Sequence, residues 1–247
     1  IKNIIEIRKV IKHTNASILH AVSVQSIVLA LFATFLNSKV KFIAAVTGLG
    51  SLFLAKTRKE KIIRFLLIIF LIVGLRKKHL KVIVQNKDDK KFVNNNLLCP
   101  INKIVIIRGS GVDINFHKMQ DDPSYPPIII SYIGRLIQDK GIEDLIKAFK
   151  LAFKSNKDIK LLLVGNLDNN NPRPLNKKYI EDSIKEDKNI EYIGEVKDVR
   201  EIWKISHIAI LPSKREGLPK SLLEAAAAGR AIISTDVPGS REIALNS

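Results

Sequence analysis

Two glutamates, Glu216 and Glu224, are eight residues apart in the segment "REGLPKSLLEAAAAGR". Pro219 suits the first turn of a helix, and Gly229 suits the end of one, so the segment between them is predicted to be helical. Glu216 then precedes the helix, and Glu224 is two turns inside it. Glu224 would face solvent, the core or a bound ligand, and an exposed helix residue is the simplest of these interpretations.

The expected start of that helix is also a candidate anion site. The first backbone N–H groups of a helix have no partner within it, and the helix dipole is positive at that end. The amides of Gly217 and Leu218 would therefore favour a phosphate or a similar anion, with Glu216 beside it.

A second segment with suitable chemistry is "SYIGRLIQDKGIEDLIKAF". A strand is predicted to end at Gly134, Arg135 and Lys140 follow in a loop, and Gly141 begins a helix. Two cations near a helix start would neutralise a diphosphate, and an Arg can bind it with two parallel hydrogen bonds. This pattern is weak by itself, because Arg and Lys in surface loops are usually only solvated.

Short apolar runs rich in Ile and Val predict the strands that position these loops. The runs are continuous rather than alternating, which is typical of parallel strands buried on both faces. Helical patterns lie between them, for example at 141–156, and this alternation predicts a doubly wound α/β fold. The predicted strands are 17–23, 40–48, 81–86, 103–109, 127–134, 159–165, 189–194, 207–213 and 231–236.

A change in composition divides the chain. The polar segment "HKMQDDPSYPP" (117–127) contains three of the nine prolines and is expected to include a linker. We therefore expect a first domain at 1–120, a linker at 121–127 and a second domain at 128–247. Two parallel-sheet domains facing a cleft are the predicted architecture, with ligands at the carboxyl ends of the strands.

The positive charge is concentrated in the first half. The whole chain carries +17, and residues 1–127 account for 21 Lys/Arg against 7 Asp/Glu. A polyanion such as nucleic acid, anionic lipid or a phosphorylated substrate would explain this excess. A Lys-rich surface from an AT-rich genome would also explain part of it. Nucleic acid is disfavoured, because no aromatic residues are interleaved with the basic ones and no nucleic-acid module is recognisable.

The most apolar stretch, "IIRFLLIIFLIVGL" (62–75), is too short to span a bilayer, which takes about 20 apolar residues. Two interpretations are open, a helix buried against the sheet and a helix lying in a membrane interface. Nine Lys/Arg and one acid between Lys56 and Lys81 favour contact between 56–81 and an anionic membrane surface.

Metal and disulfide chemistry are not expected. Cys99 is the only cysteine, so it has no internal disulfide partner, and a buried apolar position in a reducing compartment is expected for it. No cluster of Cys and His has the spacing of a metal site.

Taken together, these segments resemble the family 4 retaining glycosyltransferases, also called glycosyl transferases group 1. "EGLPKSLLE" has the family's glutamate–seven-residue–glutamate pattern, and "GRLIQDKG" is similar to its phosphate-binding segment. "AVTGLGSLF", "VIVQNKDD" and "GSGVDINFH" resemble first-half segments in the same order. The likeness is to bacterial members that build capsule, O-antigen or other lipid-linked glycans.

The resemblance implies a GT-B fold, with two Rossmann-like domains and a nucleotide-sugar donor bound mainly by the second. Arg135 and Lys140 would hold the donor diphosphate. Glu216 would lie at the donor sugar, and Glu224 would accept hydrogen bonds from the ribose hydroxyls. Gly134 and the amides of Gly217 and Leu218 would complete the donor site, and no metal or other cofactor would be needed.

The same resemblance implies a sugar transfer, with a UDP-linked donor and a lipid-linked or polysaccharide acceptor. The enzyme would lie in the cytoplasm, peripheral on the inner face of the membrane. Where many members have an active-site His, this chain has Val46 and then Thr47, Gly48 and Gly50, which would form a loop facing the cleft.

Compared with the family, the chain is expected to be truncated at both ends, with an incomplete first domain. An inactive, membrane-associated remnant is therefore the alternative to an active glycosyltransferase. A basic nucleic-acid-binding protein is the third and weakest hypothesis.

Overall fold

The computed structural model describes residues 2–35, 40–49 and 57–244. The chain forms two compact units, Ile1–Gly109 and Ser110–Ser247, here called unit 1 and unit 2. The segment expected to be a linker, 121–127, falls within unit 2. Two hydrogen bonds tie the start of this segment to the rest of unit 2. The Gln120 N–H donates to the Ala228 carbonyl at 3.2 Å, and Arg230 Nη2 donates to the Asp121 carbonyl at 2.8 Å. The assignment of domains at 1–120 and 128–247 stays a prediction.

Unit 1 contains a four-stranded parallel sheet in the order β1-β2-β3-β4. The described strands follow one another across the sheet in a single direction. Right-handed crossovers in one direction place their helices on the same face. The elements are α1 (Lys2–His13), β1 (Ile18–Val22), α2 (Val24–Ala33), β2 (Lys41–Val46), α4 (Arg58–Gly74), β3 (Leu80–Val84), α5 (Lys87–Asn96), η1 (Ile101–Lys103) and β4 (Ile104–Ile106).

Helix α4 is the apolar stretch singled out in the sequence. It begins with a capping box, in which the Thr57 hydroxyl accepts from the Glu60 N–H and the Glu60 carboxylate accepts from the Thr57 N–H. Its inner side packs on α2, where the Phe32 and Phe70 rings stack 4.1 Å apart. Gly74 lies directly against Leu31, so even a methyl group there would collide with that side chain.

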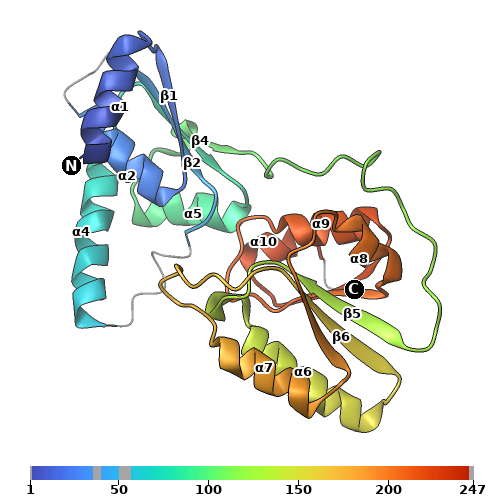
Figure 1. The fold of residues 1–247 in the computed structure, drawn as a ribbon. Coiled ribbons are helices and arrows are strands. Elements are labelled where there is room, and N and C mark those ends of the chain that lie inside the picture. Colours follow the sequence, from blue (N-terminus) through green and yellow to red (C-terminus); the bar gives the residue numbers. More distant parts are fainter. Residues whose placement is uncertain (1, 36–39, 50–56, 245–247) are drawn as a thin grey trace. The chain divides into compact units, whose positions relative to one another are not determined.

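Unit 2 contains a five-stranded parallel sheet in the order β7-β6-β5-β8-β9. From β5 the chain adds β6 and then β7 on one side. It then returns to add β8 and β9 on the other side of β5, so the sheet is doubly wound. Figure 1 shows α6 and α7 on one face and α8, α9 and α10 on the other. The elements are β5 (Ile128–Ile133), η2 (Gln138–Lys140), α6 (Ile142–Ser155), β6 (Ile159–Val164), α7 (Lys177–Glu186), β7 (Ile190–Gly194), α8 (Arg200–Ile205), β8 (Ile208–Leu211), α9 (Lys220–Ala227), β9 (Ala231–Ser234) and α10 (Pro238–Arg241).

Parallel β-structure is confirmed wherever the sequence predicted a strand. The observed strands lie inside the predicted ranges, except that β3 begins one residue earlier, at Leu80. Strand β6, which lies between β7 and β5, shows why the continuous pattern was informative, because its residues Leu161, Leu162, Leu163 and Val164 are all buried. Successive side chains of a strand point to opposite faces, so such a run must be covered on both sides.

Candidate functional site

Two loops of unit 2 meet where the direction of winding reverses, at the carboxyl ends of β5 and β8. Lys140 is the last residue of η2, which follows β5, and Glu216 lies in the loop between β8 and α9. The Lys140 Nζ donates a hydrogen bond to Glu216 Oε1, and the two side chains are only 21% and 11% exposed. The structure thus brings together two residues that the sequence placed in separate candidate segments.

Backbone contacts hold these loops against each other. Gly141 has a left-handed conformation, with φ of 72°, and a Cβ atom there would lie 2.2 Å from the Pro212 carbonyl oxygen. Only glycine allows both this close approach and this conformation at low cost. The Lys214 N–H also donates to the Asp139 carbonyl at 2.9 Å, and the Asp139 carboxylate pairs with Arg173 at 3.2 Å.

Gly134 and Arg135 lie at the same edge of the sheet, but the Arg135 side chain has a different partner. It is 63% exposed and pairs with Asp168, in the segment between β6 and α7, at 3.0 Å. Its carbonyl accepts a hydrogen bond from the Tyr132 hydroxyl at 2.8 Å. Burial, together with the negative charge of Glu216, raises the pKa of Tyr132 far above its usual range, so this hydroxyl remains a donor.

Helix α9 begins one residue later than predicted, because Pro219 is its N-cap rather than its first helical residue. Pro219 has no side-chain donor or acceptor, so it supplies no cap to the first-turn amides. The helix ends as predicted at Gly229, with φ of 74°, where the Arg230 N–H donates to the Ala225 carbonyl at 2.9 Å in a Schellman motif.

The residues before α9 are packed closely against a part of the chain that the sequence did not single out. Gly217 is buried and Leu218 is half-buried. A Cβ atom on Gly239, in α10, would lie 2.5 Å from the Gly217 carbonyl oxygen. Gly239, the glycine of the segment "DVPGSREI", was the sequence signal available for this close packing. The sequence alone could not identify Gly217 as its partner, because the two residues lie in different segments of the chain.

Glu224 is buried, so the interpretation as an exposed helix residue is wrong. The residue as a whole is only 7% exposed to solvent. Its Oε1 atom lies 3.2 Å from Lys220 Nζ, one turn earlier in α9, and 3.8 Å from His117 Nε2. His117 was not among the predicted site residues, although it ends the segment "GSGVDINFH".

The predicted loop of unit 1 is described only in part. Thr47 is exposed and Gly48 is half-buried, and both follow β2 directly, whereas Gly50 lies outside the described residues. The role of this loop in a cleft stays a prediction. Cys99 is buried, as the sequence predicted.

Over the ranges given above, no helix is both long and apolar enough to cross a bilayer. Nor do three or more His, Cys, Asp or Glu side chains of those ranges gather where they could hold a metal ion.

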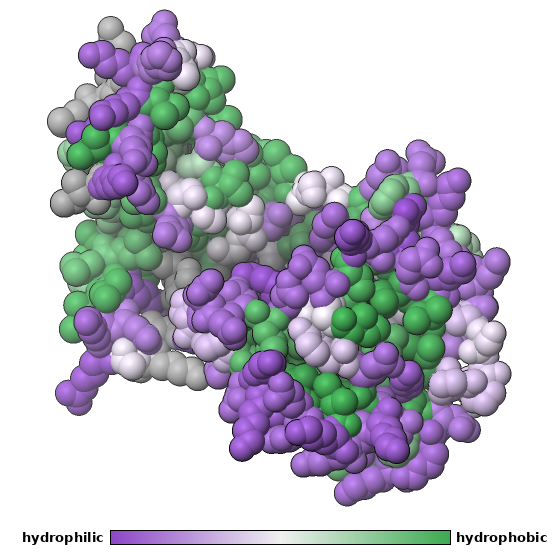
Figure 2. Space-filling model, viewed as in Figure 1, coloured by the Kyte–Doolittle hydropathy of each residue, from purple (hydrophilic) through white to green (hydrophobic). Residues whose placement is uncertain are grey.

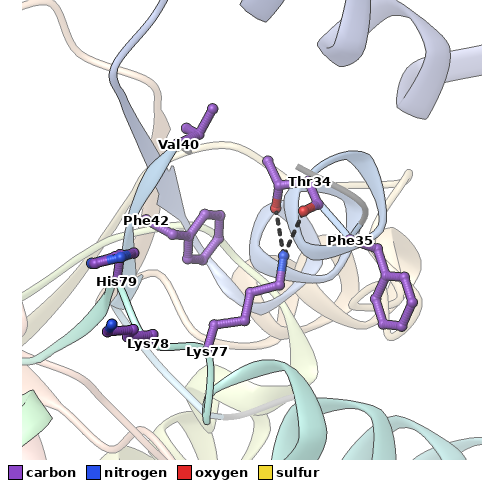
Figure 3. Close-up of a pocket in the computed structure, with 7 residues that line it drawn as sticks. All are labelled: Thr34, Phe35, Val40, Phe42, Lys77, Lys78 and His79. Carbon is purple, nitrogen blue, oxygen red and sulfur yellow. Dashed lines mark hydrogen bonds between the residues drawn. The ribbon is translucent and has the colours of Figure 1, made fainter. Parts of the chain in front are cut away.

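Unit 1 has a cavity of about 320 Å³ at the amino end of its sheet, shown in Figure 3. Lys77 projects into it and donates to the Thr34 carbonyl at 2.6 Å. Arg8 Nε likewise donates to the Ala33 carbonyl at 3.0 Å, so both cations cap the carboxyl end of α2. Burial lowers the pKa of Lys77. The other lining residues are Phe35, Val40, Phe42, Lys78 and His79.

Known proteins resemble both the sequence and the fold. A family model described as "Glycosyl transferases group 1" matches residues 115–247. The capsular polysaccharide biosynthesis glycosyltransferase CapM of Staphylococcus aureus is 29% identical over 63% of this chain and 43% of its own length. N,N'-diacetylbacillosaminyl-diphospho-undecaprenol alpha-1,3-N-acetylgalactosaminyltransferase of Campylobacter jejuni is 26% identical over 100% of this chain and 66% of its own. The chain thus spans less than two thirds of either relative.

Among solved structures, HepE of Anabaena in complex with UDP and glucose has a TM-score of 0.75. It is 15% identical, and the match covers 98% of this chain and 65% of that one. Likeness at this level of identity concerns the fold, and it confirms the α/β GT-B class expected from the sequence.

Proposed function

This chain belongs to the glycosyl transferases group 1 family, and on that premise we propose that unit 2 binds a nucleotide-sugar and that the protein transfers its sugar to an acceptor. The observation that carries the proposal is the contact between Lys140 and Glu216. Ligands of doubly wound sheets bind outside the carboxyl ends of the strands, where the winding reverses. Here that point lies between β5 and β8, and these two residues come from the loops that follow those strands.

In this proposal, Lys140 and Arg135 bind the donor diphosphate and stabilise it as the leaving group. In the transfer, the bond between the sugar C1 and the diphosphate oxygen breaks, and a bond from the acceptor oxygen to C1 forms. The acceptor's proton passes to the leaving phosphate, which assists attack from the same face, so the configuration at C1 is retained. Lys140 and Arg135 stabilise the negative charge that develops on the leaving group, and no metal ion is needed for it.

Both cations have carboxylate partners in the structure. Lys140 is paired with Glu216, and Arg135 with Asp168. A bound diphosphate would take over these cations, which would leave Glu216 at the sugar. In this arrangement the Gly217 and Leu218 amides and the backbone at Gly134 position the sugar and phosphate. Glu224 accepts hydrogen bonds from the ribose.

UDP is the nucleotide to test first, because a structural neighbour that shares this fold was solved with UDP. Titration of UDP into the protein should give saturable binding at one site in unit 2. An absence of binding would contradict the proposed donor site.

For the acceptor, we propose a lipid-linked glycan at the inner face of the cytoplasmic membrane. The name of the Campylobacter jejuni relative specifies a diphospho-undecaprenol-linked substrate, and those of two relatives specify capsular polysaccharide. An acceptor of this kind is held in a bilayer, so the enzyme must work at a membrane surface.

Helix α4 has a surface suited to that contact, which we call the α4 face. Its apolar residues recur at helical spacing and are 43% to 63% exposed, although the other side of the helix is packed in the core. Figure 2 shows apolar side chains gathered over this helix, at the left of the view. The α4 face comprises Ile62, Phe65, Leu66, Ile69 and Val73.

Basic residues at both ends of α4 complement anionic lipid. Arg58, Lys59 and Lys61 are exposed at its start, and Lys78 and His79, exposed beside the cavity of Figure 3, follow its end. A helix with an apolar face and basic flanks can lie in the interface plane. Both interpretations of the sequence therefore hold for α4 under this proposal, since one side is buried and the other is available to lipid.

Substitution of the α4 face should weaken binding to vesicles that contain phosphatidylglycerol. Ile62→Gln combined with Leu66→Gln is expected to reduce binding at least ~10-fold, because each buried apolar side chain contributes about 1.5–3 kcal/mol. Cosedimentation with the vesicles measures this. The control is Leu151→Gln in α6, a leucine that is 64% exposed in unit 2. Equal binding by the double variant and the control would refute the assignment of the α4 face to lipid.

A further inference from the structure

His117 is a buried histidine that contacts the proposed ribose-binding glutamate. Its side chain is 7% exposed, and Nε2 lies 3.8 Å from Glu224 Oε1. Its Nδ1 atom is also buried and has no hydrogen-bond partner among the described residues. A buried imidazole with one ring nitrogen unpaired has a desolvation cost, so packing alone does not explain a histidine at this position.

A short turn places His117 beside α9. The Asp113 carboxylate accepts from the Asn115 N–H at 2.8 Å, and the Asp113 carbonyl accepts from the His117 N–H at 2.8 Å. The Phe116 ring packs edge-on against the imidazole, with centroids 5.1 Å apart. The turn therefore fixes both the backbone and the ring of His117.

The Phe116 ring is itself held by a cation–π contact with Arg200. The Arg200 guanidinium lies 3.8 Å from the centre of the Phe116 ring, and two of its nitrogens donate to the Asp198 carboxylate. The hydrogen bonds from Arg200 lower the pKa of Asp198 to about 2, so this carboxylate stays charged near neutral pH. The imidazole is thus supported from the start of α8, while it contacts Glu224 in α9.

Only one of the two contacts to Glu224 can define the direction of its carboxylate. Lys220 is 65% exposed, and a long exposed side chain is held weakly by an ion pair. His117 is buried and locked by its neighbours. Both contacts are to Oε1. In the proposed donor site, Oε2 is then the oxygen that accepts from the ribose hydroxyls.

We propose that His117 is a positioning residue, which holds the Glu224 carboxylate in the orientation that recognises ribose. The inference rests on the proposed function, because it concerns the same donor site. It also assigns a role to the Asp113–His117 turn, which lies near the start of unit 2. Loss of the imidazole should therefore weaken recognition of the ribose but not of the diphosphate.

The test compares the affinities of UDP, 2′-deoxy-UDP and inorganic diphosphate by calorimetry. The wild-type protein should bind UDP ~10-fold more tightly than 2′-deoxy-UDP, the effect of one hydrogen bond to a charged group. In His117→Phe this ratio should fall to roughly 2 or below, because the carboxylate is no longer oriented, whereas diphosphate affinity stays unchanged. Glu224→Gln should lose the same discrimination, and the double variant should be no worse than Glu224→Gln alone.

The matched control is His207→Phe, another histidine of unit 2, whose Nδ1 accepts from the Ile129 N–H at 3.0 Å. It should keep the wild-type ratio. If His117→Phe does not fold, His117→Met, with a flexible side chain, carries the same expectation. A wild-type ratio in a folded His117 variant would overturn the proposal, and so would a wild-type protein that binds both nucleotides equally. Failure of the wild-type protein to bind UDP would instead overturn the proposed function.

Discussion

Replacing Lys140 with methionine is expected to lower kcat/KM for sugar transfer by about 10²–10³-fold, the typical cost of removing one group aimed at transition-state charge. Methionine keeps much of the side-chain length but removes the ammonium that would face the leaving diphosphate. Because the same charge holds the diphosphate in the ground state, UDP affinity should fall as well. Steady-state kinetics together with UDP titration measures both effects.

Lys147→Met is the matched control for this prediction. Lys147 lies in α6, is exposed, and comes from the same part of unit 2. Lys147→Met should leave both kcat/KM and UDP affinity unchanged. If Lys140→Met retained transfer within about twofold of the control, Lys140 would have no part in stabilising the leaving group.

Glu216→Gln should have an effect of similar size on transfer but, unlike Lys140→Met, should not weaken nucleotide binding. We expect kcat to fall about 10²-fold, because the sugar loses the group that positions it. UDP affinity should stay equal or rise, since the substitution removes the carboxylate that pairs with Lys140 and would compete with the diphosphate for it. This divergence separates a role at the sugar from simple unfolding, which would lower both.

Glu201→Gln, an exposed glutamate in α8, serves as the comparison variant. Full transfer activity in Glu216→Gln would show that the role assigned to Glu216 is wrong. A parallel loss of UDP binding would show that its pairing with Lys140 supports the site rather than competing with the donor.

The sequence was informative wherever the cause of structure is local. Continuous apolar runs located the strands, because a parallel strand is buried on both faces along its whole length. Gly229 marked the end of α9, since a left-handed residue after a helix is usually glycine. The ends of β5 and β8 could also be expected to lie at one edge of a parallel sheet, which placed Arg135, Lys140 and Glu216 in the same region.

Side-chain partners between distant segments could not be predicted. The pairing of Arg135 with Asp168 depends on how the segment after β6 folds back over the loop after β5, where Leu136 and Leu167 form a bridge. The burial of Glu224 depends on the segment that contains His117, which contacts α9 although it lies far from α9 along the chain. The helical pattern of α9 alone was compatible with exposure, because alanine neighbours suit either environment.

The central claim is that the loops after β5 and β8 bind one nucleotide together. Hydrogen–deuterium exchange during the UDP titration tests it most directly. The account predicts that UDP slows exchange in peptides covering 134–141 and 212–221 at the same UDP concentration, and that Lys140→Met reduces protection of both. Protection confined to one of these loops, or found only elsewhere in the chain, would contradict the assignment of a shared donor site.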